Sequence, residues 1–464
     1  MDRLTGLDAS FLYLETPEQL MHVSGLLLID PATMPGGYDF ASLRDAIGRR
    51  VRDEPTFTRK LRRVPLGLDH PIWVEDTHFD IERHVHRLAV PSPGTERELA
   101  EVVGHLTGLV LDWSRPLWEM WVIEGLASGH VAVLTKMHHA SVDGVNGATA
   151  LSFLCGLEPD AALLDVGSDV PALSRVPGLA ELAAKGVLAT VTWPVRLASM
   201  VGPTVNILAG AARRSLRGRA MAAPLTAPRT SFNATITGHR SVAWCDMDLE
   251  RIKEIKRAVD GATVNDVVLS VAGGALRRYL ADRGELPETS LLATVPVSVH
   301  GRSRSEHGRN KVSSLFTRLG TDVADPLERL RQLSVVNRHA KDHHRAIPAD
   351  TLQDFARLAA PGMFALATRA VSTLRLADRG PVIHNLIISN VPGPPVPLYF
   401  MGARIDGLYP LGPIFHGAGL NITAMSSNGR MHVGVIACRE SVPRPWELTE
   451  AIEKELDALG AALL

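Results

Sequence analysis

The sequence predicts an α+β protein built from two lobes, and three observations carry this prediction. The chain has 464 residues, more than a single hydrophobic core ordinarily holds. Segments of strand and helix character follow one another without the regular alternation of a doubly wound sheet. A stretch free of Asp and Glu runs from Leu182 to Cys245 and separates the two halves.

We therefore divide the chain into an N-terminal lobe at 1–170, a helical crossover linker at 171–240 and a C-terminal lobe at 241–464. The crossover combines basic residues with many Leu, Val, Ala and Met, and Pro194 and Pro203 break it into short helices. Two interpretations stay open for its acid-free part. It is either a solvated cationic connector or a segment that lies on an anionic membrane, with arginines at the level of the headgroups.

Composition excludes several classes of protein. The chain is 45% hydrophobic and 21% charged, which is typical of a globular protein rather than a disordered or polytopic one. The net charge of −1 provides no basic field for nucleic acid. Three scattered cysteines predict no disulfide framework and a reducing compartment. Neither a secretory signal nor an apolar run of about 18–20 residues is present, so we expect a cytoplasmic protein without a spanning helix.

The elements of the first half follow from apolar spacing and from turn residues. Helical spacing of apolar residues predicts helices, and β-rich apolar runs predict strands. The predicted elements are a helix running into a strand within 8–30, a helix at 40–51, a strand at 70–76, a helix at 96–109, strands at 112–126 and 130–140, and a helix at 145–157.

The second half is predicted on the same grounds. Thr263 or Asn265 is a candidate cap for a long helix at 264–284, and Asn428-Gly429 predicts the turn of a β-hairpin over 419–439. The C-terminal lobe begins near 241–249, and the other predicted elements are strands at 291–299 and 311–319, a strand into a proline-rich turn over 385–402, and helices at 249–259, 324–344, 351–377 and 445–463.

A histidine pair marks the candidate site. His138 and His139 end the strand at 130–140, and Asp143 and Gly144 follow at the turn into the next helix. Neighbouring strand residues point to opposite faces, so only one of the histidines faces a given cleft if the strand persists that far. A neutral imidazole there removes a proton from a hydroxyl or thiol near pH 7.

Three other interpretations compete. A metal site at His139 and Asp143 would need a distant third ligand, because no HxxE or CxxC lies nearby. The pair is alternatively structural, as a buried and hydrogen-bonded histidine. Ser141 as a nucleophile lacks the G-x-S-x-G elbow.

Five motifs together resemble one family. MHHASVDG matches the HHxxxDG motif of the CoA-dependent acyltransferase superfamily, which includes chloramphenicol acetyltransferase-like enzymes and peptide-synthetase condensation domains. LDASFLYLETPEQLMHVSGLLLI, PLWEMWVIEGL, VNDVVLSVAGGALRRYL and ISNVPGPPVPLYFMG narrow the resemblance to the bacterial wax ester synthase/diacylglycerol acyltransferase (WS/DGAT) family. They occur in the family's order over nearly the whole chain. The resemblance implies two chloramphenicol-acetyltransferase-like lobes with mixed sheets and an active-site tunnel between them.

The resemblance also implies roles for individual residues. His139 is the general base that deprotonates the acceptor hydroxyl, and acyl transfer is direct, without an acyl-enzyme. His138 supports the site, Asp143 maintains the turn and Gly144 packs beneath it. Substrate-tunnel or structural roles are implied for the remaining motif residues: Pro116, Leu117, Trp118, Asn265, Asp266, Ser389, Asn390, Val391, Pro392 and Gly393.

A basic loop departs from the family pattern. The family often has an Arg soon after PVS, whereas here His300 comes before Arg302. On charge grounds, the candidates for binding the CoA phosphates are Arg302, Arg304, Arg309 and Lys311.

The implied function is acyl-CoA-dependent O-acyl transfer to diacylglycerol, to a fatty alcohol, or to both. Acyl-CoA is a co-substrate, and no cofactor or metal is expected. The implied surroundings are the inner membrane or lipid droplets, with peripheral attachment. The alternatives are a condensation-like enzyme that uses a carrier-protein thioester and a non-catalytic lipid-binding or droplet-coat protein.

Overall fold

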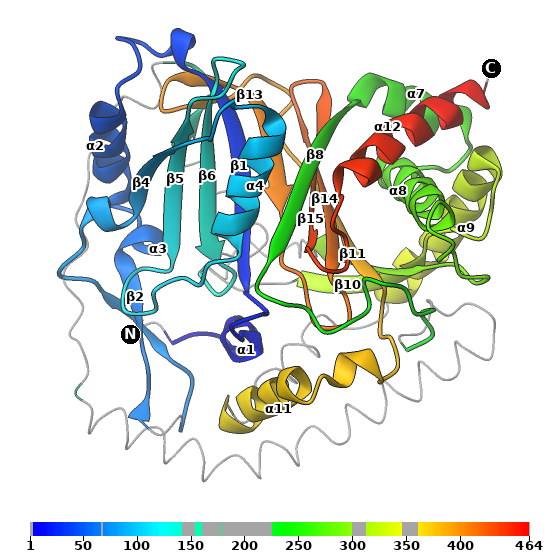
Figure 1. Ribbon diagram of the computed structural model, residues 1–464, viewed down its shortest axis with the longest axis horizontal. Helices are drawn as coiled ribbons and strands as arrows, with labels where there is room; N and C mark the ends of the chain where they lie inside the picture. Colours follow the sequence, from blue (N-terminus) through cyan, green and yellow to red (C-terminus); the bar gives the residue numbers. More distant parts are fainter. Residues whose placement is uncertain are drawn as a thin grey trace.

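The computed structural model describes residues 3–65, 68–141, 154–159, 178, 225–298, 312–345 and 361–463 (Figure 1). Within these ranges it contains two mixed β-sheets with helices packed on them, which confirms the predicted α+β architecture. No helix in these ranges is both long and apolar enough to cross a bilayer.

The first sheet has the strand order β4-β5-β6-β1-β13-β12-β7 in the described residues. Only β4 and β5 pair in parallel. The strands are β1 (His22–Asp30), β4 (Val85–Ala89), β5 (Trp118–Glu124), β6 (Val131–His138), β7 (Cys155–Gly156), β12 (Tyr399–Phe400) and β13 (Ala403–Leu411).

Helices on both faces of the first sheet explain why strand β1 has apolar residues on both of its faces. Leu27 of β1 packs in the same core cluster as α2 (Phe40–Val51), whereas Leu26 packs in the cluster of α4 (Glu96–Thr107). Alternate residues thus enter different cores, and the strand needs no polar face. The lobe also contains α1 (Gly6–Leu14), α3 (Pro55–Thr58), the 3-10 helices η1 (Pro31–Thr33) and η3 (Ile81–Arg83), and a ribbon of β2 (Arg59–Arg62) with β3 (Ile72–Glu75).

The second sheet has the order β10-β9-β11-β14-β15-β8. Strand β11 is parallel to both neighbours, and the other pairs are antiparallel. The strands are β8 (Arg240–Asp248), β9 (Leu292–Ser298), β10 (Val312–Arg318), β11 (Leu386–Pro392), β14 (Leu420–Ser427) and β15 (Arg430–Cys438). The helices of this half are α7 (Leu249–Ala258), α8 (Val264–Ala281), α9 (Pro326–Arg345), α11 (Pro361–Thr373), η5 (Leu376–Asp378) and α12 (Trp446–Ala461).

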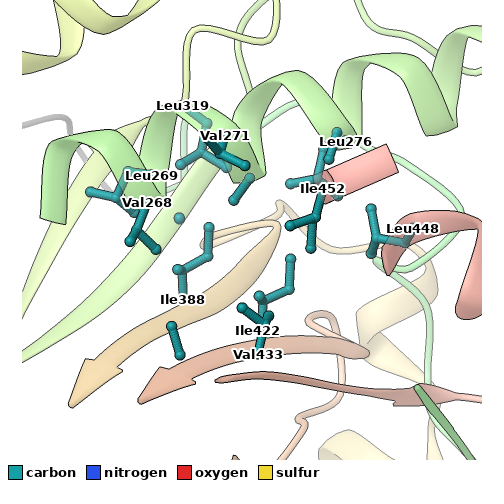
Figure 2. Packing of buried hydrophobic residues seen from close by; sticks show 14 of the residues in the cluster. Val268, Leu269, Val271, Leu276, Leu319, Ile388, Ile422, Val433, Leu448 and Ile452 are labelled. Carbon is teal, nitrogen blue, oxygen red and sulfur yellow. The ribbon is translucent and has the colours of Figure 1, made fainter. Parts of the chain in front are cut away.

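The core of the second lobe lies between its sheet and α8. Val268 of α8 faces Ile388 and Ile422 of the sheet, and Ile452 of α12 closes the side (Figure 2). Thr263 caps α8 in a reciprocal box with Asp266, which decides between the two predicted caps. The predicted hairpin turn is confirmed, because Asn428 and Gly429 have φ of 44° and 80°.

Helix α4 joins the two lobes. Its residues share one core cluster with Val242 and Trp244 of β8 and with Leu26 of β1. A Cβ on Gly104 would lie 2.7 Å from the carbonyl oxygen of Arg240, so only glycine permits this approach. Figure 1 shows α4 between β1 and β8.

The sheets do not follow the order of the chain. Residues 399–411 lie in the range predicted for the second lobe, yet β12 and β13 pair in the first sheet. The helix predicted over 145–157 is wrong at its end, because Cys155–Gly156 is strand β7 and pairs with β12. The polar backbone of this segment completes a sheet edge, a long-range pairing that local helical spacing does not encode.

Candidate active site

The site lies at the end of β6, where three strands meet. The His138 amide donates to the carbonyl of Leu117 at 2.9 Å, and the His139 amide donates to that of Met21 at 2.8 Å. The chain then turns, and the Ser141 amide donates to the His138 carbonyl at 2.9 Å. The backbone of both histidines is thereby fixed by neighbouring segments before any side chain contributes.

The His138 imidazole is fully buried and uses both nitrogens. Nδ1 accepts a hydrogen bond from the Ala140 amide at 3.0 Å. An amide can only donate, so Nδ1 carries no proton and the proton is on Nε2. Nε2–H donates to Oε2 of Glu15 at 2.5 Å. His138 therefore links the turn after β6 to Glu15, the residue that follows α1.

The His139 imidazole is partly exposed and stacks on Phe11, with ring centroids 4.0 Å apart. Its Nδ1 is buried and has no hydrogen-bond partner among the described residues. Burial lowers the pKa of His139 to about 4, and a contact with its own backbone acts in the opposite direction. The ring is thus neutral at pH 7, as a general base must be.

Helix α1 and the residue that follows it contact both histidines, a role that sequence reasoning missed. Phe11 lies in the last turn of α1, and Glu15 is the residue that follows the helix, with an extended backbone. One contacts His139 and the other His138. The alternation rule for strands does not separate the two rings, because β6 ends at His138. The spacing of Phe11 and Glu15 is visible in the sequence, but nothing there pairs them with the histidines.

The PLW residues lie directly behind the turn. Pro116, Leu117 and Trp118 are buried, and Leu117 shares a small core with Ala140 and with α1. The Trp118 indole donates to the Phe57 carbonyl at 2.8 Å. In this structure all three pack in the protein interior.

The ND residues begin α8 and differ in their surroundings. Asp266 is buried and accepts hydrogen bonds from Thr263 and, at 2.7 Å, from the Asn337 amide. It therefore ties α8 to α9. Asn265 is partly exposed, and its side chain makes no hydrogen bond to the described residues.

The SNVPG residues stand where the chain leaves the second sheet for the first. Ser389 and Asn390 pair with Thr423 and Ala424 of β14. Pro392 ends β11, and a Cβ on Gly393 would lie 2.3 Å from the Ser426 carbonyl oxygen. Beyond this close approach the chain continues to β12 and β13 of the first sheet.

Several predicted site residues lie outside the described residues: Asp143, Gly144, Arg302, Arg304, Arg309 and Lys311. Their roles stay predictions. Ser141 is described, and its hydroxyl is buried without a hydrogen-bond partner in that part of the chain.

Two family models match the chain. The wax ester synthase/diacylglycerol acyltransferase catalytic domain matches residues 4–268, and the WS/DGAT C-terminal domain matches residues 309–460. A putative diacylglycerol O-acyltransferase of Mycobacterium tuberculosis (strain CDC 1551 / Oshkosh) is 44% identical, over 99% of this chain and 90% of that protein. A probable diacylglycerol O-acyltransferase of M. tuberculosis (strain ATCC 25618 / H37Rv) is 36% identical over the full length of both.

Solved structures similar to this chain support the same family assignment as the sequence relatives. A wax ester synthase/diacylglycerol acyltransferase from Marinobacter aquaeolei VT8 matches with a TM-score of 0.71 and 30% identity, covering 100% of both chains. The first condensation domain of the CDA synthetase matches with a TM-score of 0.57 and 16% identity, covering 99% of this chain and 95% of that chain, and supports the fold alone. The resemblance predicted from the motifs is confirmed: the chain belongs to the wax ester synthase/diacylglycerol acyltransferase family.

Proposed function

We propose that the chain transfers a long-chain acyl group from acyl-CoA to the hydroxyl of diacylglycerol, with His139 as the general base. One observation carries this proposal: the neutral imidazole of the partly exposed His139 directly follows β6, and Phe11 of α1 stacks on it. Buried Nδ1 leaves Nε2 as the nitrogen that can reach a hydroxyl.

The reaction balances with this single base. His139 Nε2 takes the proton of the acceptor hydroxyl as that oxygen attacks the thioester carbonyl carbon. The tetrahedral intermediate collapses with cleavage of the C–S bond. The imidazolium returns the proton to the CoA thiolate, so that an ester and free CoA leave. No acyl-enzyme forms.

The catalytic demand is moderate because a thioester is already an activated acyl donor. A positioned base supplies roughly 10²–10⁴-fold acceleration. Orientation of the two substrates supplies more, up to about 7–11 kcal/mol of the barrier for well-aligned groups. Exclusion of water also matters, since hydrolysis of acyl-CoA is the competing reaction.

Relatives support the choice of acceptor. Those with 44% and 36% identity are named diacylglycerol O-acyltransferases, which favours diacylglycerol. The Marinobacter protein is named a wax ester synthase as well, which makes fatty alcohols the second acceptor class. Neither name supports a carrier-protein donor or a non-catalytic coat protein.

The test is an acyl transfer assay with radiolabelled acyl-CoA and an acceptor panel of diacylglycerol, long-chain alcohols and water. We expect labelled triacylglycerol from the wild type and none from His139→Ala. His105→Ala is the matched control, because His105 is exposed on α4. Transfer by His139→Ala at the wild-type rate would refute the assignment of the base. Label found only in free fatty acid would refute acyl transfer to an alcohol.

Peripheral attachment to a lipid surface is part of the proposal, and α11 supports it. Large apolar side chains are exposed along α11 and the segment after it, including Leu366 at 69% and Leu374 at 66%. The sequence of residues 361–383 contains one acidic residue, Asp378, and its carboxylate accepts a hydrogen bond from Arg375. Two further arginines of this segment, Arg369 and Arg379, are exposed. Exposed apolar side chains among cations favour an anionic bilayer surface.

This surface adjoins the site. Helix α11 packs against α1, and the Ser372 hydroxyl bonds to the Glu18 carboxylate at 3.2 Å. Figure 1 shows the two helices side by side at one edge of the molecule. A lipid acceptor leaving a membrane here would arrive next to the catalytic turn.

Flotation with phosphatidylglycerol vesicles tests the attachment. Leu366→Asp with Leu374→Asp should reduce the bound fraction several-fold, since each buried apolar side chain contributes about 1.5–3 kcal/mol. Val336→Asp on α9 is the control, because Val336 is also an exposed apolar residue. Replacement of the arginines at 213–219 by Gln tests the cationic segment separately. Unchanged flotation of the α11 variant would exclude this surface.

A further inference from the structure

We infer that Glu15 is a positioning residue that, through His138, places a fixed negative charge beside the base; this inference rests on His139 being the base of the proposed function. Glu15 does not touch the base. It bonds to His138 at 2.5 Å, and His138 directly precedes His139.

The hydrogen bonds define the charge of the pair. The Ala140 amide occupies Nδ1 of His138, so His138 donates its Nε2 proton and Glu15 accepts it. The pair of a neutral imidazole and a carboxylate carries one negative charge. In a doubly protonated His138, the proton on Nδ1 would point at the hydrogen of the Ala140 amide. The hydrogen bond from this amide therefore disfavours the doubly protonated state.

His139 needs such a charge during the reaction. It becomes an imidazolium when it takes the proton of the acceptor, in a place where burial already disfavours the charged form. Many catalytic histidines have a carboxylate bonded to Nδ1. Here Nδ1 of His139 is buried and has no such partner among the described residues. A neighbouring carboxylate that acts through His138 supplies the missing stabilisation.

Two other titratable groups near His138, His22 and Lys136, have hydrogen-bond partners of their own. His22 of β1 pairs with His138 in the sheet, and its ring bonds to the Thr107 carbonyl at 2.9 Å. On β6 itself, the buried Lys136 ammonium lies 3.2 Å from Glu119 and bonds to two carbonyls of the α4 end. Glu119 is therefore paired with Lys136, whereas Glu15 bonds to His138 and interacts with the Lys136 ammonium only through its charge.

The turn after α1 holds Glu15 in position. The Thr16 amide donates to the Gln19 carbonyl at 3.0 Å, and the Gln19 side-chain amide donates to the Leu14 carbonyl at 2.7 Å. The Glu15 side chain is only 10% exposed. A fixed, poorly solvated carboxylate acts more strongly on a neighbour than a mobile surface one does.

The experiment compares Glu15→Gln, Glu15→Asp and Glu15→Ala with Glu18→Gln as the matched control. Gln keeps an acceptor for the His138 proton but removes the charge. Glu18 lies on the same turn and bonds to Ser372 instead of a histidine. Two quantities are measured: kcat and KM for acyl transfer, and the pKa of His139 by NMR titration of the labelled imidazoles, assigned from the His139→Ala spectrum.

We expect Glu15→Gln to lower kcat by about tenfold or more, which corresponds to about 1.4 kcal/mol of lost transition-state stabilisation, with KM nearly unchanged. The pKa of His139 should fall in this variant and stay in place in Glu18→Gln. Glu15→Asp should recover part of kcat, and Glu15→Ala should lose the most.

Two results would overturn the inference. One is a Glu15→Gln enzyme with wild-type kcat and an unmoved His139 titration. The other is an equal loss of kcat and of melting temperature in Glu15→Gln and Glu18→Gln, which would show that the turn only stabilises the fold. If the wild type transfers no acyl group, the proposed function fails, while the NMR titration still decides whether Glu15 acts on His139.

Discussion

The rings of Phe11 and His139 lie nearly parallel, with their planes 21° apart and their centroids 4.0 Å apart. Helix α1 thus covers one face of the proposed base and shields that face from water. The stack restricts the ring to one orientation, which is the condition for proton transfer to a substrate held at a fixed place.

Replacing Phe11 with Leu should lower kcat about two- to tenfold, because an aromatic pair contributes about 0.5–1.5 kcal/mol beyond its buried area. KM should change little, since the ring orients the base and not the substrate. Steady-state kinetics with acyl-CoA and diacylglycerol measure both. Tyr13→Phe is the control on the same helix, because Tyr13 bonds to His70 rather than to a catalytic histidine. A wild-type kcat for Phe11→Leu would show that the stack does not orient the base.

Activity should persist well below the pH at which an ordinary histidine becomes protonated. Burial lowers the pKa of His139 to about 4, so the neutral, active form prevails above that pH and is lost as the pH falls through it. The acidic limb of kcat/KM should therefore lie near pH 4 and not near the ordinary value of about 6.5. Rates measured from pH 3.5 to 8, with refolding controls at neutral pH, locate the limb. A limb near 6.5 would contradict the buried environment of the ring.

Asp266→Ala should destabilise the protein by roughly 2–4 kcal/mol, because it removes the capping box of α8 and leaves the Asn337 amide without its acceptor. Denaturant titration gives this free energy of unfolding. The adjacent Asn265→Ala should change stability by less than about 0.5 kcal/mol, because Asn265 is partly exposed and its side chain makes no hydrogen bond to the described residues. A loss of kcat in Asn265→Ala at unchanged stability would then mark Asn265 as a contact of the site. Equal stability of the two variants would contradict the structural role of Asp266.

Acid should weaken the fold partly through His384. Both ring nitrogens are buried without a hydrogen-bond partner in the described part of the chain, and burial lowers the pKa to about 4. The unfolded chain binds the proton more readily, so this stabilisation is complete above about pH 6.5 and is lost as the pH falls from 6.5 through 4. The contribution is roughly 3 kcal/mol.

The free energies of unfolding of wild type and His384→Leu, measured at several pH values, test this expectation. Their difference should change between pH 6.5 and 4, because the variant lacks the titrating group. His105→Leu, at an exposed position on α4, should follow the wild-type pH dependence. Parallel stability curves for wild type and His384→Leu would rule out the contribution.

Local patterns determined most elements of this protein. The helix predicted at 40–51 is α2, Phe40–Val51, because its apolar residues repeat at helical spacing and pack on one sheet face. The hairpin at Asn428-Gly429 follows from the two residues that its turn requires. The HHxxxDG motif also places His139 at a strand end, because strand, turn and histidine pair adjoin in the chain.

Only the tertiary structure brought Glu15 to His138, across 123 positions of the chain, and Phe11 to His139. It also placed β12 and β13 in the first sheet and made Cys155–Gly156 a strand. These contacts depend on register and packing between distant segments. The periodicity of apolar residues predicts which face of a helix or strand is buried, but it does not predict which distant residue packs on that face. The proposed base was therefore a candidate from its neighbours in the chain, whereas Phe11 and Glu15, which contact the histidine pair, became visible only in the fold.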